Sequence, residues 1–176
     1  MNIYVLLKRT FDTEEKISLS DGAVNEDGAK LIINPYDEYA VEEAIVTRDA
    51  HGGEVTVITV GNDEAETEIR TALAMGADKA VLINVEDDVD VRDQYTTAKV
   101  IAEYLKDKNA DLIFAGNSAV DNSTSQVGHR VADLLGIPCV TSAIKFELEG
   151  TTATITRDIE GDSEVVSAAL PMLVAA

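Results

Sequence analysis

The sequence predicts an α/β fold of three layers, in which helices cover both faces of a parallel sheet and antiparallel hairpins are appended. Two observations lead to this prediction. Up to residue 136, short apolar runs rich in β-branched residues alternate with segments whose apolar residues recur at helical spacing. After residue 139, extended segments are instead separated by glycine-containing turns. The first pattern is typical of βαβ units, and the second of antiparallel hairpins.

Four apolar runs are expected to form the parallel sheet, at residues 2–7, 54–60, 79–83 and 111–115. Their composition is that of strands buried on both faces. Parallel strands need right-handed crossovers, which the helical segments between them supply. Ligands bind such sheets beyond the carboxyl ends of the strands. The segments that follow the first and fourth strands are therefore the candidate binding loops.

The helical segments lie between and after these strands. Asn34 followed by Pro35 predicts a helix start, with Asn34 as the N-cap and proline at the first helical position. Gly76 and Gly136 are placed to end later helices. The expected spans are from residue 34 to about 51–53, from about 62 to 76, from about 93 to 106, and from about 127 to 135.

The rest of the chain is expected to be extended. Antiparallel hairpins are predicted over residues 141–148, 151–158 and 163–170, and another between residues 11 and 33. Residues 171–176 form an apolar strand pattern that no turn or polar tail follows. We therefore expect a single domain over residues 1–176 that is cut short at its C-terminus.

The stretch from Gly116 to Gly128 is the most informative about function, because it joins the fourth apolar run to a helix through small polar residues. The first N–H groups of a helix lack intrahelical partners and, with the helix dipole, attract anions. Small side chains allow a phosphate to approach that backbone. The stretch is therefore a candidate nucleotide-phosphate loop, although a polar, glycine-containing loop is also an ordinary connection between a strand and a helix.

Composition narrows the function classes. The chain has 33 acidic and 14 basic residues, a net charge of −19, and no basic stripe that could bind nucleic acid. Acidic stretches such as residues 86–88 are expected in solvated loops. No apolar stretch approaches the roughly 20 residues of a membrane span, so no membrane insertion is expected. No basic leader or cleavage pattern follows Met1, which predicts a cytoplasmic protein.

Five segments occur in an order typical of one family. They are VLLKR at residues 5–9, NPYDEYAVEEA at 34–44, RTALAMGAD at 70–78, the polar loop at 116–128 and TRDIEG at 156–161. Together they resemble the β subunit of electron transfer flavoproteins over the whole length of the chain. The polar loop is similar to the AMP-binding segment of that family.

The resemblance implies a Rossmann-like, adenine-nucleotide α-hydrolase-like fold and a domain without catalytic residues of its own. The two histidines of the chain, His51 and His129, are isolated and lack ligand spacing, so no metal site is expected. A domain of this family binds AMP as a structural ligand and forms a heterodimer with an α subunit that carries FAD. Electrons arrive from acyl-CoA or related dehydrogenases, as in fatty acid oxidation, and leave to a quinone reductase or another acceptor. In the family, a recognition loop and an arm that follow the position of residue 176 contact these partners.

Two alternatives stay open. In one, a second FAD occupies the AMP site, as in flavin-based electron-bifurcating relatives. In the other, the chain is an ATP-binding or ATP-hydrolysing domain of the same fold. The sequence disfavours hydrolysis, because residues 7–10 are LKRT where an ATP pyrophosphatase of this architecture carries a Ser-Gly-Gly-type loop, and no Walker A pattern occurs.

By position, the resemblance also implies which residues surround the nucleotide. They are Leu6, Asn34, Tyr36, Val60, Gly116, Asn117, Asp121, Asn122, Ser123, Thr124, Ser125, Gln126 and Val127. Asp121 is expected to act as the N-cap of the following helix, and Gln126 to bond phosphate or ribose. The hydroxyls of residues 123–125 are expected to donate to phosphate. Tyr36 is expected to lie on the side that faces the flavin of the partner.

One departure from the family concerns the cation that binds the phosphate. Asn117 stands where family members often carry lysine. A phosphate is bound most strongly by charged donors. The cation is therefore expected to come from Lys8, Arg9 or Arg130.

Overall fold

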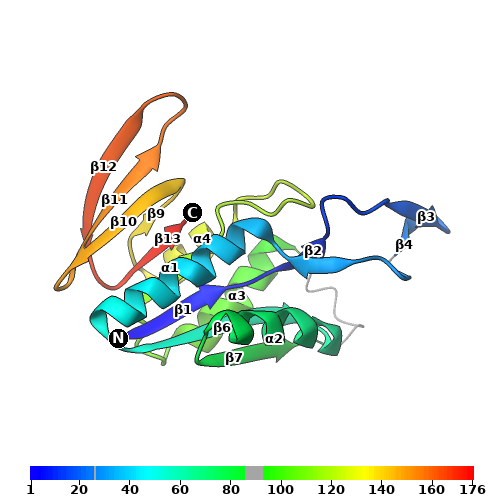
Figure 1. Ribbon diagram of the computed structural model, residues 1–176, viewed down its shortest axis with the longest axis horizontal. Coiled ribbons are helices and arrows are strands. Elements are labelled where there is room, and N and C mark those ends of the chain that lie inside the picture. The colour runs from blue at the N-terminus through cyan, green and yellow to red at the C-terminus, as the bar shows by residue number, and fades with distance from the viewer. Residues whose placement is uncertain (26, 86–92) are drawn as a thin grey trace.

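The computed structural model describes residues 1–25, 27–85 and 93–176 (Figure 1). The acidic stretch predicted at residues 86–88 lies outside the described residues. In chain order the elements are β1 (Asn2–Leu6), β2 (Arg9–Phe11), β3 (Ser18–Ser20), β4 (Ala23–Asn25), β5 (Leu31–Ile33), α1 (Pro35–His51), β6 (Glu54–Gly61), the 3-10 helix η1 (Asp63–Ala65), α2 (Glu66–Met75), β7 (Lys79–Asn84), α3 (Gln94–Leu105), β8 (Leu112–Ala115), α4 (Val127–Leu135), β9 (Cys139–Val140), β10 (Ala143–Glu149), β11 (Thr152–Asp158), β12 (Ser163–Ala169) and β13 (Met172–Ala175).

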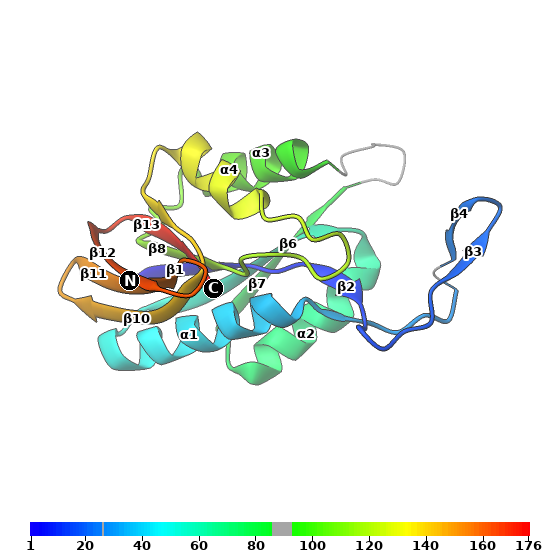
Figure 2. The same cartoon turned by 90° about the horizontal axis from the view of Figure 1, so that it is seen from above.

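Within the described ranges, a six-stranded sheet forms the centre of the molecule in the order β7-β6-β1-β8-β13-β9. Each of its pairings is parallel, and the central strand β1 pairs Ile3 with Val55 on one side and with Leu112 on the other. Helices α1 and α2 cover one face, and α3 and α4 cover the opposite face (Figure 2). The predicted three-layer α/β fold is confirmed.

The two faces of the sheet have separate hydrophobic cores. Val41 of α1 and Phe114 of β8 belong to the core on the α1 and α2 side. Ile101 of α3 and Ile113 of β8 belong to the core on the α3 and α4 side. Successive strand residues point to opposite faces, so a strand covered on both sides needs apolar residues at every position. This is why the strands of this sheet occur as continuous apolar runs in the sequence.

Strand β13 brings the last described residues back into the main sheet. It pairs in parallel with β8 on one side and β9 on the other, and all four of its residues are buried. The prediction of an apolar strand at residues 171–176 is confirmed, but the sequence does not give its neighbours. The strand places Ala176 beside the loop that follows β8, where the N–H of Asn117 donates to the Ala176 carbonyl oxygen at 2.7 Å.

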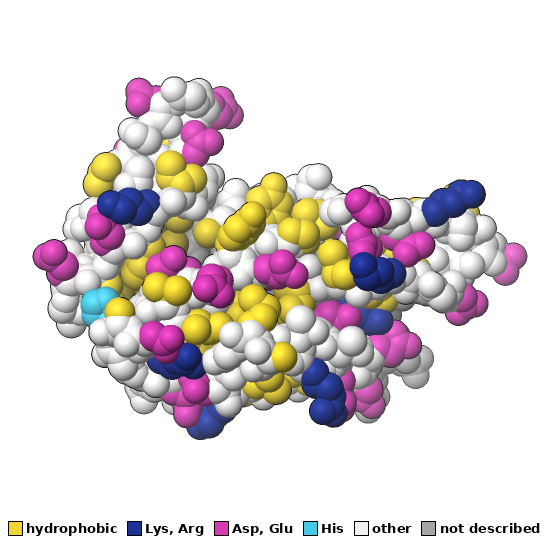
Figure 3. Space-filling model, in the orientation of Figure 1, with side chains coloured by type: hydrophobic (Ala, Val, Ile, Leu, Met, Phe, Trp, Pro, Cys, Tyr) yellow, Lys and Arg dark blue, Asp and Glu magenta, His cyan; other side chains and the backbone are white. Residues whose placement is uncertain are grey.

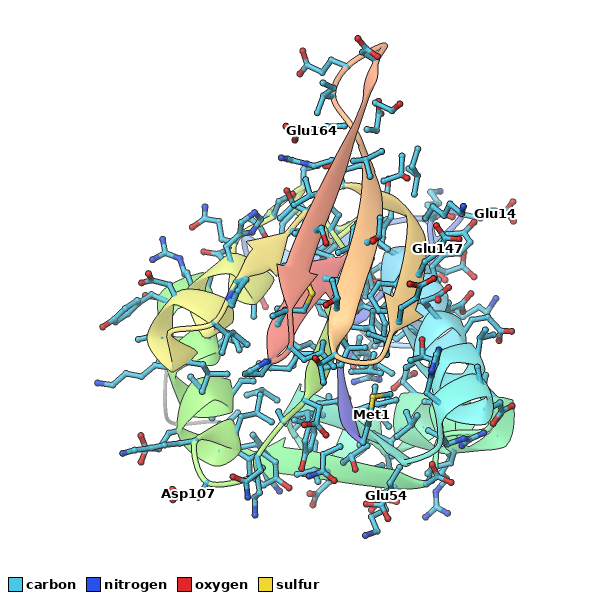
Figure 4. The ribbon with its side chains drawn as sticks, turned by 90° about the vertical axis from the view of Figure 1, so that its left-hand side faces the viewer. Met1, Glu14, Glu54, Asp107, Glu147 and Glu164 are labelled. Carbon is cyan, nitrogen blue, oxygen red and sulfur yellow. The ribbon has the colours of Figure 1, made fainter. Side chains whose placement is uncertain are left out.

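The hairpins predicted after residue 139 form a separate antiparallel sheet in the order β10-β11-β12. The Phe146 ring of this sheet meets the Phe114 ring of the main sheet edge to face, with centroids 5.2 Å apart. Ile155 of β11 is buried in the same core. The end of the small sheet near Glu164 projects away from the main body (Figure 4).

The hairpin predicted between residues 11 and 33 is also present. Strands β2 and β5 pair in antiparallel fashion at its base, and β3 and β4 pair at its tip. Asp21 and Gly22 have positive φ angles of 53° and 81° and form the tight turn at the tip. The tip projects beyond the main sheet (Figures 1 and 2).

The surface reflects the acidic composition of the chain. Asp and Glu side chains are spread over the visible face, with fewer Lys and Arg among them (Figure 3). Within the described part of the chain, no helix combines the length and the apolarity needed to cross a bilayer.

Candidate functional site

A cavity of about 430 Å³ lies beyond the carboxyl ends of the central strands. Leu6, Val60 and Ala115, at or near the ends of β1, β6 and β8, line it. The loop from β8 to α4, at residues 116–126, borders it, and so does the segment that follows β1. Its volume falls within the range of about 300–1,000 Å³ that is usual for small-molecule sites. The two loops singled out in the sequence therefore border one cavity.

Most of the site residues expected from the sequence line this cavity. Tyr36 and Ser123 do not; the Tyr36 side chain is exposed on the first turn of α1. The orientation of Tyr36 toward a partner's flavin stays a prediction. The residues brought together are Leu6, Asn34, Val60, Gly116, Asn117, Asp121, Asn122, Thr124, Ser125, Gln126 and Val127.

The loop between β8 and α4 is held by bonds within itself. The N–H of Ser123 donates to the Ala119 carbonyl oxygen at 2.8 Å, and Ser123 has a positive φ of 53°. The Thr124 hydroxyl donates to Oδ1 of Asn122 at 2.8 Å, and the Thr124 N–H donates to the same oxygen. These bonds hold the loop in a turn in the absence of a ligand. To donate to a phosphate, the Thr124 hydroxyl would have to break its hydrogen bond with Asn122.

The expectation that Asp121 caps the helix is wrong. Helix α4 begins at Val127, and its N-cap residue is Gln126, whose side chain makes no capping hydrogen bond to the backbone N–H groups of the helix. Asp121 lies several residues earlier in the loop, where its carboxylate instead meets the ammonium of Lys8. The first N–H groups of α4 thus have no side-chain cap, and residues 127–129 that carry them line the cavity.

Asn34 occupies the predicted N-cap position of α1, but its side chain makes no capping hydrogen bond to the backbone N–H groups of that helix. Its amide group donates to the Ser118 carbonyl oxygen at 2.8 Å, and its Oδ1 accepts from the N–H of Val120 at 3.2 Å. The side chain is buried, so these two bonds are shielded from water. Asn34 therefore fastens the loop at residues 116–126 to the start of α1.

Asp37 is a buried residue of this site that the sequence does not reveal. Its Oδ2 accepts from the N–H of Lys8 at 2.7 Å, and its Oδ1 accepts from the N–H of Gly116 at 3.0 Å. Burial raises the pKa of Asp37 from 3.8 to about 7, against the opposing effect of these donors. One carboxyl thus joins α1 to the ends of β1 and β8.

Each cation expected to serve the phosphate already has a partner. Lys8 Nζ lies 2.6 Å from both carboxylate oxygens of Asp121. Arg9 forms ion pairs with Glu64 at 3.0 Å and with Glu68 at 3.2 Å. Arg130 donates to the amide oxygen of Gln126 at 2.8 Å and lies over the Tyr95 ring; it does not line the cavity.

Thr10 contributes a second feature that points to a ligand. Its hydroxyl is buried without a hydrogen-bond partner in the described chain, and Thr10 lines the cavity. A buried hydroxyl without a partner is unfavourable, so a polar ligand that bonds it would be stabilised. The uncapped first turn of α4 gives the cavity backbone N–H donors for an oxygen-rich, anionic ligand. Among the described residues, no cluster of three or more His, Cys, Asp or Glu side chains is placed to hold a metal ion.

Comparison with known proteins gives consistent matches. The family model described as electron transfer flavoprotein domain matches residues 21–176. The electron transfer flavoprotein subunit beta of Bacillus subtilis (strain 168) is 56% identical over 176 residues, which are 100% of this chain and 68% of that protein. The subunit of the same name from Syntrophomonas wolfei is 42% identical over 175 residues, which are 99% of this chain and 68% of that protein.

A relative with a different name also matches nearly the whole chain. The acryloyl-CoA reductase electron transfer subunit gamma of Anaerotignum propionicum is 34% identical over 178 residues. These cover 99% of this chain and 66% of that protein. Its name, like those of the other two relatives, refers to electron transfer.

Proposed function

Since this chain belongs to the β subunits of the electron transfer flavoprotein family, we propose that it binds AMP as a structural ligand in the cavity beyond β1 and β8. In this proposal the chain is a subunit of a cytoplasmic electron carrier and has no catalytic residues of its own. Its partner is an α subunit that carries FAD. The complete carrier accepts electrons from an acyl-CoA or related dehydrogenase and passes them to a quinone reductase or another acceptor.

The first turn of α4 is the observation that carries the AMP proposal. It borders the cavity, and the side chain of its N-cap residue does not cap its backbone N–H groups. Such a turn binds phosphate through backbone N–H groups. We assign the phosphate to the N–H groups of residues 127–129, with Ser125 and Gln126 beside them, and the adenine to the apolar surface near Leu6. AMP supplies no redox chemistry, so electron transfer is left to the flavin of the partner.

A second FAD in the same cavity is the alternative. Phe11 and Leu31, from the paired strands β2 and β5, also line the cavity. These residues give the cavity an apolar surface outside the loop at residues 116–126, where the rest of a dinucleotide could lie. The sequence-based alternative of ATP hydrolysis has no comparable observation in its favour.

Identification of the nucleotide in the purified chain tests the proposal. The protein would be denatured, and any released ligand identified by absorbance and mass spectrometry. A ligand-free preparation would then be titrated calorimetrically with AMP, ADP, ATP and FAD. Stoichiometric AMP, or preferential AMP binding, is expected. Stoichiometric FAD would support the alternative, steady release of inorganic phosphate from ATP would support hydrolysis, and failure to bind any of the four would overturn the proposal.

Replacement of Thr10 by valine tests whether the Thr10 hydroxyl binds the ligand or affects only the stability of the chain. In the ligand-free chain, Thr10→Val is expected to raise the free energy of unfolding by about 1 kcal/mol, because a buried hydroxyl without a partner is removed. If the ligand displaces the groups that cover this hydroxyl and bonds it, the same change is expected to weaken AMP binding about fivefold. Chemical unfolding and calorimetric titration measure the two effects.

Thr59 provides the matched control for this test. Its hydroxyl is equally buried but donates to the Leu7 carbonyl oxygen at 3.1 Å, and Thr59 does not line the cavity. Thr59→Val is therefore expected to lower the free energy of unfolding by about 1 kcal/mol and to leave AMP affinity unchanged. Equal AMP affinity of the Thr10→Val variant and the wild type would exclude Thr10 from the ligand site.

A further inference from the structure

The two loops that border the cavity are joined by one ion pair. Lys8 follows β1, Asp121 lies in the loop after β8, and Lys8 Nζ is 2.6 Å from both carboxylate oxygens. Both side chains line the cavity. They are partly exposed, with 42% of the Lys8 and 25% of the Asp121 side chain accessible to solvent. The ammonium group of Lys8, which lines the cavity, is therefore already paired with a carboxylate of the same chain.

Arg9, the neighbouring cation, is not free to exchange partners. Its guanidinium pairs with two carboxylates, and that of Glu68 is only 5% exposed. Removing Arg9 would leave a buried carboxylate without a counter-ion, which is strongly unfavourable. Asp121 in contrast can be hydrated when Lys8 leaves, and partly exposed ion pairs add little to stability. Lys8 is thus the cavity cation that can change partners at low cost.

We propose that Lys8 binds the phosphate of the nucleotide and that Asp121 takes the place of this phosphate in the ligand-free chain. This inference rests on the proposed function, because it needs a phosphorylated ligand in the cavity. Carboxylate and phosphate present similar anionic oxygens to an ammonium group, so they compete for it. Nucleotide binding exchanges one anion for the other, and Asp121 lowers the affinity by holding Lys8.

The charge of the site makes this exchange important. Besides Asp121, the buried carboxyl of Asp37 also lines the cavity, and the chain as a whole has a net charge of −19. If Lys8 stayed on Asp121, a phosphate in the described cavity would meet neither a free ammonium nor a free guanidinium group. Repulsion by the surrounding carboxylates would then oppose binding through the helix N-terminus alone.

A double-mutant cycle tests the exchange, with AMP as the probe and calorimetric titration of the full chain as the measurement. Asp121→Asn is expected to tighten AMP binding about three- to tenfold, because Lys8 loses its competitor. Lys8→Met is expected to weaken AMP binding by about tenfold or more. In the Lys8→Met background, Asp121→Asn is expected to tighten AMP binding less than it does in the wild type, because there it relieves repulsion only and frees no cation. Circular dichroism and thermal unfolding would verify that each variant is folded.

Glu54→Gln is the charge-matched control. It removes one negative charge, as Asp121→Asn does, and breaks the ion pair of Glu54 with Lys79 at 2.8 Å. Neither of these residues lines the cavity. Adenosine, which lacks the phosphate, is the control ligand. The Glu54→Gln variant should bind AMP like the wild type, and adenosine affinity should not differ among the variants.

The outcomes distinguish this inference from the proposed function. If the wild type binds neither AMP nor the other nucleotides, both the proposed function and the exchange are overturned. Two outcomes would show that the exchange is wrong while the proposed function stands. In the first, the wild type binds AMP and Asp121→Asn binds it no more tightly. In the second, Asp121→Asn increases AMP affinity by the same factor in the Lys8→Met background as in the wild type. Weaker AMP binding by Asp121→Asn would likewise overturn the exchange, and would make Asp121 a ligand-binding residue instead.

Discussion

Replacement of Asp37 by asparagine is expected to change how the free energy of unfolding depends on pH. The carboxyl is buried where α1 meets the ends of β1 and β8, and burial raises its pKa from 3.8 to about 7 in the folded chain. The folded state therefore holds this proton more tightly than the unfolded state does. The stabilisation that results is present at low pH and is lost as the pH rises.

The size and window of this loss follow from the two pKa values. Below about pH 4 the carboxyl is protonated in both states. As the pH rises through about 7, the unfolded chain loses its proton first, and the folded chain loses about 4 kcal/mol of stability from this group. Above about pH 8 the loss is complete. Asp37→Asn has no proton to lose at this position, so this part of the pH dependence disappears.

Urea unfolding of the wild type and the Asp37→Asn variant between pH 5 and pH 8 measures the effect. At pH 5 the variant is expected to be about 1–3 kcal/mol less stable, because its amide group turns a donor toward a backbone N–H. By pH 8 this deficit should shrink by about 3 kcal/mol, or reverse, because only the wild type loses stability. At each pH, the free energy of unfolding of the variant is subtracted from that of the wild type, so that the contributions of the other acidic groups cancel.

Glu38 supplies the control for this experiment. It is the next residue of α1, and its side chain is exposed. Glu38→Gln should follow the wild-type profile across the same pH range. Parallel profiles for Asp37→Asn and the wild type would contradict the assignment of the titrating group to Asp37.

The central sheet was predictable because burial on both faces leaves a strong signal in the sequence. Residues 2–7, 54–60, 79–83 and 111–115 are rich in apolar and β-branched residues, and all four segments lie in the main sheet. The order of the strands in the sheet, in contrast, cannot be predicted from the composition of the runs. Residues 171–176 have the same apolar composition wherever they pair, and their place between β8 and β9 depends on contacts far along the chain.

The candidate site shows where local patterns stop being sufficient. Asn34 and Asp121 both have side chains suited to capping a helix, but each finds a partner distant in sequence. Asn34 bonds the backbone at Ser118 and Val120, and Asp121 bonds Lys8. A capping assignment uses only the next few residues, whereas these bonds depend on how the loop after β8 turns. The sequence identified the two loops that border the cavity but not the bonds that shape it.

Asp37 was missed for a related reason. An acidic residue in the first turn of a helix is a common, solvent-exposed feature that complements the helix dipole. Nothing in the residues around Asp37 distinguishes it from exposed Glu38. Its burial results from the ends of β1 and β8 closing over the start of α1, which only the assembled fold supplies.

Replacement of Gly116 by alanine is expected to destabilise the chain by about 1–3 kcal/mol, because this glycine lies against the start of α1. A Cβ at Gly116 would come within 2.3 Å of Oδ1 of Asp37, 2.8 Å of Cβ of Tyr36 and 2.9 Å of the backbone nitrogen of Asp37. The backbone nitrogen of Asp37 belongs to the helix backbone and Cβ of Tyr36 is attached to it, so neither atom can move unless the helix moves. Helix α1 and the end of β8 would have to separate, which would also widen the cavity and weaken the proposed AMP binding.

Gly128, at the other end of the same stretch, is the matched control. A Cβ there would lie 3.5 Å from Cδ2 of Leu173 and 3.6 Å from Cβ of Ala115, which are ordinary contacts. Because Gly128 lies in α4, alanine is expected to stabilise the chain by about 0.5–1 kcal/mol. Urea unfolding of both variants tests the pair, and AMP titration is applied to Gly116→Ala alone, because Gly128 lies in the proposed phosphate site. If Gly116→Ala were as stable as the wild type, α1 could move away from β8 at little cost, and the glycine would not fix the geometry of the cavity.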